Sequence, residues 1–271
     1  MDESKDMDIT IREIDNKKGV WVALIGAIVT LTMYPWAFAH DYYKLIEIEK
    51  AKGPAGCENN VIWYYPAFTD IGLLSGVFFL SAAYGFYKRK KWAYPFAAIG
   101  AVMALKGSFW PMVPPMSNGE FPSYFFVFLP SLIVYLLLTF LVAKLSWKHV
   151  GFGIITGMAM ITSFMNAIAA TNRMQAVAPP ANWIYVMTQR LNMVAGLAIG
   201  VVAVAVLVVP KKEWVKVTAL TAGLLELIVG GTVATTYSIE VGRISFFFLG
   251  PFFTALMLLI MFTSIYDKIV N

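Results

Sequence analysis

Residues 61–110 read VIWYYPAFTD IGLLSGVFFL SAAYGFYKRK KWAYPFAAIG AVMALKGSFW, and this stretch decides the fold class. It contains two long apolar runs, Val61–Tyr87 and Trp92–Trp110, separated by the basic turn Lys88–Lys91. A helix that crosses a bilayer needs about 20 mostly apolar residues. Each run therefore predicts a transmembrane helix, and the basic turn predicts a tight connection at the membrane surface.

The same pattern extends over the rest of the chain. Of its 271 residues, 59% are hydrophobic and only 14% are charged, and the mean hydropathy is +0.69. An ordinary soluble domain is about one quarter charged, so this composition excludes a soluble globular protein and a disordered one. The sequence predicts an all-α integral membrane bundle of eight transmembrane helices, at Val20–His40, Val61–Tyr87, Trp92–Trp110, Tyr124–Leu145, Val150–Thr171, Trp183–Val209, Trp214–Tyr237 and Ile244–Tyr266.

The connections between these spans are too short to hold a separate soluble domain. We expect a polar cytoplasmic N-terminus at residues 1–19 and a single transmembrane domain at residues 20–271. The first apolar stretch has no clear cleavage site of small residues after it, so Val20–His40 is predicted to be a retained helix rather than a signal peptide. The charged segment Asp41–Lys52 is predicted either to lie on the outer leaflet as an amphipathic helix or to extend the first helix.

The basic residues predict the orientation, because Lys and Arg concentrate in cytoplasmic loops. With the N-terminus inside, the inner segments carry 14 of the 21 Lys and Arg residues and the outer segments carry 5. We therefore predict a multi-pass protein of the cell membrane with both termini in the cytoplasm. The net charge of +5 is explained by these basic inner loops, which face anionic lipid headgroups. The expected partners are membrane lipids; other membrane subunits or a homo-oligomer stay open, and no nucleic acid is expected.

Motifs for catalysis and cofactor binding are missing from the sequence. Two His and one Cys cannot supply the ligands of a zinc cluster, an iron–sulfur centre or a bis-His haem. No GxSxG, HExxH, P-loop or Gly-rich dinucleotide motif occurs. We therefore predict no cofactor, no metal site and no catalytic residue. His40–Asp41 is interpreted as an interfacial histidine beside solvated acids, and most of the Trp and Tyr residues as anchors at the membrane interfaces.

Four charged residues lie inside the predicted spans: Asp70, Lys106, Arg190 and Glu226. A charge in the hydrocarbon region costs about 2.5–3.5 kcal/mol on insertion scales, and such residues usually face the bundle interior and pair with one another. A rise of about 1.5 Å per residue places Glu226 close to the midplane and Lys106 in the outer third. The four charges are thus predicted to gather in the outer half of the bundle.

Helical spacing predicts how several polar residues face. Glu226 shares a face with Gly223 and Gly230, and small residues allow close helix approach, so Glu226 is predicted to point inward. Asn192 lies on one face with further glycines of its helix, whereas Arg190 is rotated off that stripe. The adjacent glycines at positions 230 and 231 favour a site where another helix packs closely, rather than a break in this helix.

Two interpretations of the four charges compete. In the structural one, Asp70–Arg190 and Glu226–Lys106 form buried ion pairs that fix helix register, or Lys106 extends to the outer interface. In the functional one, the charges surround a polar cavity that opens to the outside and binds a small polar or ionic ligand. An intramembrane acid is a functional hypothesis by default.

The sequence favours a protein that binds or translocates a small solute or ion through this cavity. The residues predicted to bind the ligand or ion are Asp70, Lys106, Asn166, Arg190, Asn192 and Glu226. The alternative is a non-catalytic structural subunit of a larger membrane complex, which the GxxxG pair Gly72 and Gly76 suits equally well. A lesser alternative is a lipid-modifying membrane enzyme with Asp70 or Glu226 as general acid or base, and an enzyme is the less favoured class.

Overall fold

The computed structural model describes residues 14–52 and 58–270, and every regular element within them is a helix. The elements are α1 (Asn16–Lys52), α2 (Glu58–Tyr87), α3 (Ala93–Phe109), η2 (Trp110–Met112), α4 (Val113–Ser117), α5 (Phe125–Leu137), η3 (Leu138–Val142), α6 (Trp147–Ala176), α7 (Trp183–Val208), α8 (Glu213–Val241), η4 (Phe246–Phe248), α9 (Leu249–Met261) and α10 (Ser264–Val270). Most of the polar N-terminus, and Cys57, lie outside the described residues. The segment after His40 extends the first helix, because α1 continues to Lys52.

Within the described residues, seven helices are long and apolar enough to cross a membrane, when α3 is counted with its continuation to Ser117 and α5 with η3. The last predicted span is bent. Its first part covers Phe246–Met261, about 24 Å at the usual helical rise, and α10 then turns away by 79°. Counted as one bent span, the two helices make the eighth candidate. The helices are those of a multi-pass membrane protein.

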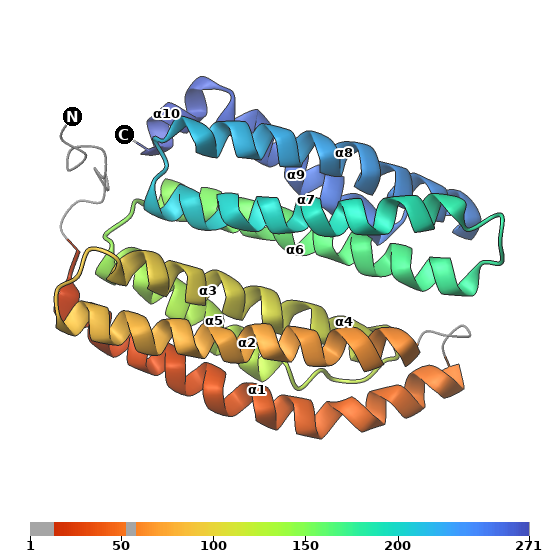
Figure 1. Cartoon of the computed structure of the whole chain (residues 1–271), viewed down its shortest axis with the longest axis horizontal. Coiled ribbons are helices and arrows are strands. Elements are labelled where there is room, and N and C mark those ends of the chain that lie inside the picture. Colours follow the sequence, from red (N-terminus) through yellow and green to blue (C-terminus); the bar gives the residue numbers. More distant parts are fainter. Residues whose placement is uncertain (1–13, 53–57, 271) are drawn as a thin grey trace.

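The helices pack as two groups of four (Figure 1). The first group contains α1, α2, α3 and α5, and the second contains α6, α7, α8 and α9. In both groups each helix packs on the next one along the chain, and the fourth helix returns to pack on the first. The connecting loops predict no four-plus-four repeat, so this common packing order is visible only in the structure.

The two groups meet through α3, α6 and α7. The spans of α3 and α6 are the most buried, with 67% and 72% of their most apolar windows buried. Near the predicted outer end, the Tyr64 hydroxyl on α2 lies 2.9 Å from the Thr171 hydroxyl on α6. Thr171 in turn donates to Gln189 of α7 over 3.1 Å. This chain of hydrogen bonds joins the groups at that end.

Glycines on α2 let α1 approach closely in the first group. Gly72 faces the ring of Tyr34, and Gly76 faces Thr30 and Leu31 of α1. The GxxxG pair is therefore a helix-packing face. Tyr34 is fully buried, and its hydroxyl donates to the carbonyl of Ala104 on α3. One tyrosine thus connects three helices of this group.

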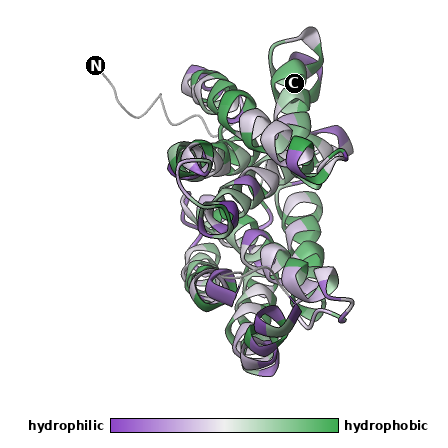
Figure 2. Cartoon of the chain, turned by 90° about the vertical axis from the view of Figure 1, so that its right-hand side faces the viewer, coloured by the Kyte–Doolittle hydropathy of each residue, from purple (hydrophilic) through white to green (hydrophobic). Residues whose placement is uncertain are grey.

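The aromatic residues divide into two populations. Figure 2 shows hydrophobic residues on the outer faces of the helices as well as between them. Trp63 and Trp147 are well exposed, and each lies near the first residue of its helix, as anchors at a membrane interface should. Tyr65, Tyr124 and Tyr185 are fully buried, so the interpretation of these three as anchors is wrong. They pack and form hydrogen bonds inside the bundle.

The glycine face of α2 gives a stability prediction. Replacing Gly72 with Ala places a methyl group where the Tyr34 ring lies, whereas Gly157 on α6 has no neighbouring atom within 4 Å of the added methyl. We expect Gly72→Ala to lower the free energy of unfolding by about 1–3 kcal/mol, the usual cost of overpacking. Gly157→Ala is the matched control, expected to be neutral or slightly stabilising because Ala favours the helix. Thermal unfolding in detergent measures both, and equal melting temperatures would contradict the packing described.

Candidate functional site

Asp70 and Arg190 do not enter the bundle interior. Asp70 is exposed on the same face of α2 as Leu74, and Arg190 is exposed on the same face of α7 as Val194. No ion pair joins the two charges in the part of the chain that the structure describes. The predicted Asp70–Arg190 pair is therefore wrong, because helix packing turns both residues outward.

Lys106 lies deeper than predicted. Because α3 continues through η2 and α4, Lys106 is near the middle of the span Ala93–Ser117 rather than in its outer third. Its side chain is buried, with 8% exposed, and its Nζ lies 3.4 Å from the centre of the Phe164 ring on α6. Among the described residues, no hydrogen bond or ion pair involves Lys106. Both the pairing with Glu226 and the extension to the outer interface are wrong.

Glu226 is the buried acid at the centre of the second helix group. Its side chain is fully buried on α8, and its Oε1 accepts a hydrogen bond of 2.9 Å from Asn166 Nδ2 on α6. Ser163, one turn before Asn166, also lies beside the carboxyl group. The predicted inward orientation of Glu226 is confirmed, and Asn166 is its hydrogen-bonding partner.

Two glycines make room for this pair. A methyl group added at Gly230 of α8 or at Gly250 of α9 would overlap both Glu226 Oε1 and Asn166 Nδ2. The hydrogen bond therefore lies between the two glycines. Any side chain at either position would occupy the space that the bonded atoms need. The helix α8 continues unbroken past Gly230, so the glycine pair of α8 does not break the span.

The oxygen atoms around this pair lack hydrogen-bonding partners. Glu226 Oε2, Asn166 Oδ1 and Thr254 Oγ1 are buried and have no partner among the described residues. Thr254 follows Gly250 by one turn on α9, on the face that meets the pair. Buried polar groups are normally hydrogen-bonded, so three unpartnered oxygens on three adjoining helices need an explanation. We refer to Glu226, Asn166, Gly230, Gly250 and Thr254 as the Glu226 centre.

Asn192 is fully buried, but it bonds to its own helix. Its Nδ2 donates to the carbonyl of Thr188, one turn earlier on α7, over 3.1 Å. No hydrogen bond joins Asn192 to Glu226 in the described segments. Of the six residues predicted to bind a ligand or ion, the structure brings together Asn166 and Glu226.

A polar cavity lies between the two helix groups near the predicted outer end. Its volume is about 360 Å³, and it is lined by residues of α1, α2, α4, α6 and α8, among them Glu49, Asn60 and Asn118. Asn60 Oδ1 is buried there without a partner in the described chain. None of the six predicted site residues lines this cavity. It shares the helices α6 and α8 with the Glu226 centre and contacts α6 at positions 165 and 169, on either side of Asn166 in sequence.

Asp41 is a second buried carboxylate, which the sequence analysis missed. It is 4% exposed, and its Oδ2 accepts hydrogen bonds of 3.1 Å from the backbone N–H of Ser123 and from the Tyr65 hydroxyl. Its Oδ1 accepts from Ser123 Oγ over 2.7 Å. The interpretation of Asp41 as a solvated acid is wrong. The spacing of the buried positions 34, 37, 41 and 45 on α1 would have revealed it, had α1 been extended past His40.

His40, Asp41 and Ser123 contain the residue types of a hydrolase triad, but their geometry differs from one. In a triad, the nucleophile and the carboxylate contact different ring nitrogens of the histidine. Here Ser123 Oγ and Asp41 Oδ1 both lie next to His40 Nδ1, at 2.9 and 2.7 Å. Ser123 also contacts the carboxylate directly. This arrangement fixes the start of α5 on α1 and provides no proton relay.

A third carboxylate joins helices of the second group near the same end. Glu240 of α8 accepts hydrogen bonds from Arg173 Nε over 3.0 Å and from the Tyr185 hydroxyl over 2.7 Å. Arg173 belongs to α6 and Tyr185 to α7, so one carboxylate connects three helices. In contrast to Glu226, this acid has a cationic partner.

The comparisons with known proteins add no family. No protein-family model matches the chain, and neither the curated proteins nor the solved structures contain a significant match. The function is therefore argued from the geometry of the Glu226 centre and its surroundings.

The Asp41 contacts give a second stability prediction. In Asp41→Asn an NH2 group replaces one of the two oxygens that accept hydrogen bonds from Ser123 and Tyr65. The new N–H donors then face the N–H or O–H donors of these residues. We expect a loss of about 2–3 kcal/mol in the free energy of unfolding, because hydrogen bonds to charged groups are the stronger ones. Glu49→Gln, which alters a carboxylate with a single bond to Asn118, is the control and should change stability much less. Equal losses in thermal unfolding would count against the role of Asp41 in holding α1 to α5.

Proposed function

We propose that this membrane protein binds a proton at Glu226 and uses its binding and release to move a small solute or ion across the membrane. The observation that supports this is a fully buried carboxyl group at mid-span without a cationic partner among the described residues. Leaving an ionised carboxylate unpaired in a low-dielectric interior costs several kcal/mol. Acids in such positions are typical of proton relays and substrate pathways.

The neighbours of Glu226 favour a proton over a metal ion. Asn166 Nδ2 donates a hydrogen bond to Oε1, and Oε2 has no partner among the described residues. A proton on Oε2 neutralises the carboxyl group without further ligands. A hard cation such as Ca²⁺ needs six to eight oxygen ligands, and Mg²⁺ needs an octahedral set. The described residues around Glu226 offer fewer than that.

The helix α9 is the part of the centre best suited to movement. It belongs to the bent last span, it ends at a sharp turn before α10, and its Gly250 lies against Glu226 Oε1. In the mechanism we propose, a shift of α9 relative to α6 and α8 exposes Oε2 to water. The polar cavity near the predicted outer end would then supply the route on that side, because its wall includes α6 and α8.

Proton binding at Glu226 is testable by infrared difference spectroscopy during a pH titration of the purified protein. We expect a carbonyl band of a protonated carboxyl group that persists at neutral pH in the wild type and is absent in Glu226→Gln. The control is Glu213→Gln, which changes an exposed acid on the same helix and should leave the band unchanged. A wild-type spectrum without such a band would refute proton binding. Proteoliposomes under an imposed membrane potential should take up protons faster with wild type than with Glu226→Gln.

The orientation is also a proposal, and it rests on the distribution of basic residues. We propose a cell-membrane location with both termini in the cytoplasm, which places Cys57 outside and the turn 88–91 inside. A membrane-impermeant maleimide is expected to label wild-type Cys57 in intact cells. A Cys57→Ser, Arg89→Cys double variant should be labelled only after the cells are permeabilised. The reverse result would show that the basic bias misleads.

A further inference from the structure

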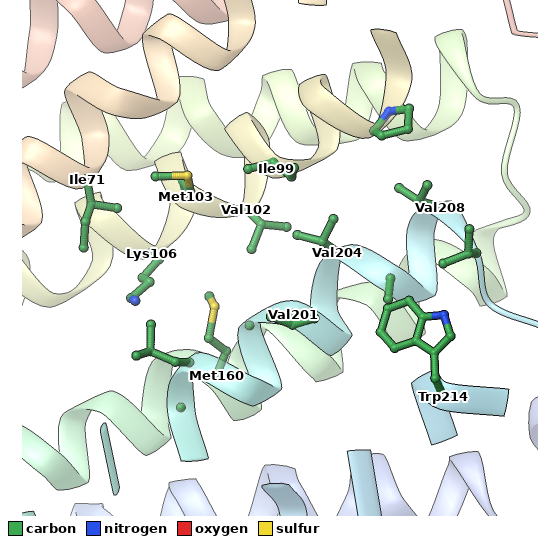
Figure 3. A pocket seen from close by; sticks show the side chains of 16 residues that line it. Ile71, Ile99, Val102, Met103, Lys106, Met160, Val201, Val204, Val208 and Trp214 are labelled. Atoms are coloured by element: carbon green, nitrogen blue, oxygen red, sulfur yellow. The ribbon is translucent and has the colours of Figure 1, made fainter. Parts of the chain in front are cut away.

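A long apolar groove separates the two helix groups on one side of the molecule (Figure 3). Its volume is about 520 Å³, within the usual range of ligand sites. The walls come from α3 and α7, with single contributions from α2, α6 and α8. Its lining includes Leu197 and Val201, which are 57% and 53% exposed, so the groove opens on the flank that faces lipid.

Lys106 is the single charged residue among the 16 that line this groove. Figure 3 shows its amino group at one end and Trp214 at the other. On α7 the lining extends from Gly196 to Val209, which corresponds to about 20 Å along the helix. The groove is therefore elongated. The Lys106 amino group lies at its mid-span end, and apolar residues line it from there to Trp214.

The position of the Lys106 amino group is defined by packing. The centre of the Phe164 ring lies 3.4 Å from Nζ. The same ring packs against Gly196 of α7, where an added methyl group would overlap it. The ring face attracts the ammonium group, but it does not neutralise it. No carboxylate of the described residues pairs with Lys106, so the described chain offers no counter-charge to the ammonium form of this lysine.

We propose that this groove binds a long-chain fatty acid, with the carboxylate at Lys106 and the hydrocarbon chain directed toward Trp214. One lysine matches one negative charge, and the remaining lining is apolar and open to the acyl chains of the bilayer. This site is separate from the Glu226 centre, and the two share no lining residue.

The depth of Lys106 selects the kind of headgroup. Lys106 is the fourteenth residue of the span Ala93–Ser117, so it lies about 16–20 Å from either end. A phospholipid would have to draw its bulky headgroup away from the interface to reach it. A fatty acid has a single small carboxyl group, which crosses the hydrocarbon as a neutral acid. On arrival it gives its proton to the uncharged amine of Lys106, and the resulting carboxylate and ammonium groups form the ion pair. The groove thus favours a free carboxylate over a phosphate headgroup.

The experiment uses the full-length protein in detergent and a fatty acid brominated near its methyl end, which quenches nearby tryptophan. We expect saturable quenching in the wild type, most of it lost in Trp214→Phe. Lys106→Met should weaken the apparent affinity about 10- to 100-fold, as expected for a lost charge-assisted contact. Lys91→Met, which alters an exposed lysine of the turn at 88–91, is the matched control and should bind as the wild type does.

Three further arms keep the proposal falsifiable. The Lys106→Met variant should not have a lower melting temperature than the wild type, because it removes a buried charge that has no partner among the described residues. Val204→Trp, which fills the groove and keeps Lys106, should abolish saturable quenching. The methyl ester of the same acid should bind the wild type as weakly as the acid binds Lys106→Met. Unchanged binding to Lys106→Met, equal quenching by an acid brominated beside its carboxylate, or equal competition by a single-chain phospholipid would each overturn the proposal.

Discussion

The lack of water in the hydrocarbon region is the constraint on which this structure depends, because each buried polar group has to find its partner within the protein. Asp41 meets this requirement with donors from Tyr65 and Ser123. Glu240 meets it with Arg173 and Tyr185. Glu226 and Lys106 do not. Glu226 has Asn166 and Ser163 beside it but no partner for its Oε2, and Lys106 has only an aromatic ring. Among these four charged residues, the two with incomplete pairing are the ones to which we assign functions.

The two helix groups share a packing order and differ in what fills them. The first group closes around tyrosines such as Tyr34, which lies against Gly72 and bonds to α3. The second group encloses the Glu226 centre, whose glycines leave space and whose oxygens lack partners. A close-packed aromatic interior suits a rigid support. An interior with an unsatisfied acid beside a bent span suits a site that changes its protonation or conformation.

The charges of the membrane region separate according to where helix packing points them. Asp70 and Arg190 face outward, Glu226 faces the interior of the second group, and Lys106 faces the groove between the groups. Opposite charges at similar depth predicted pairs, but pairing also requires that two helices present their charged faces to each other. Here α3 presents Lys106 to α6 and α7, whereas Glu226 meets α6 and α9. A single cavity formed by all four charges is therefore excluded for the described chain.

The amino-acid sequence by itself determined the all-helical membrane bundle, nearly all of its helix positions and the inward position of Glu226. These follow from the local period of the helix and from the length of apolar runs, which the chain carries along its own sequence. The tertiary structure alone decided that Asn166 contacts Glu226, that Asp41 is buried, and that Lys106 ends in an apolar groove. These three features depend on which helices are neighbours and on how far a helix extends past its apolar run. The periodicity of a single segment encodes neither of these two properties.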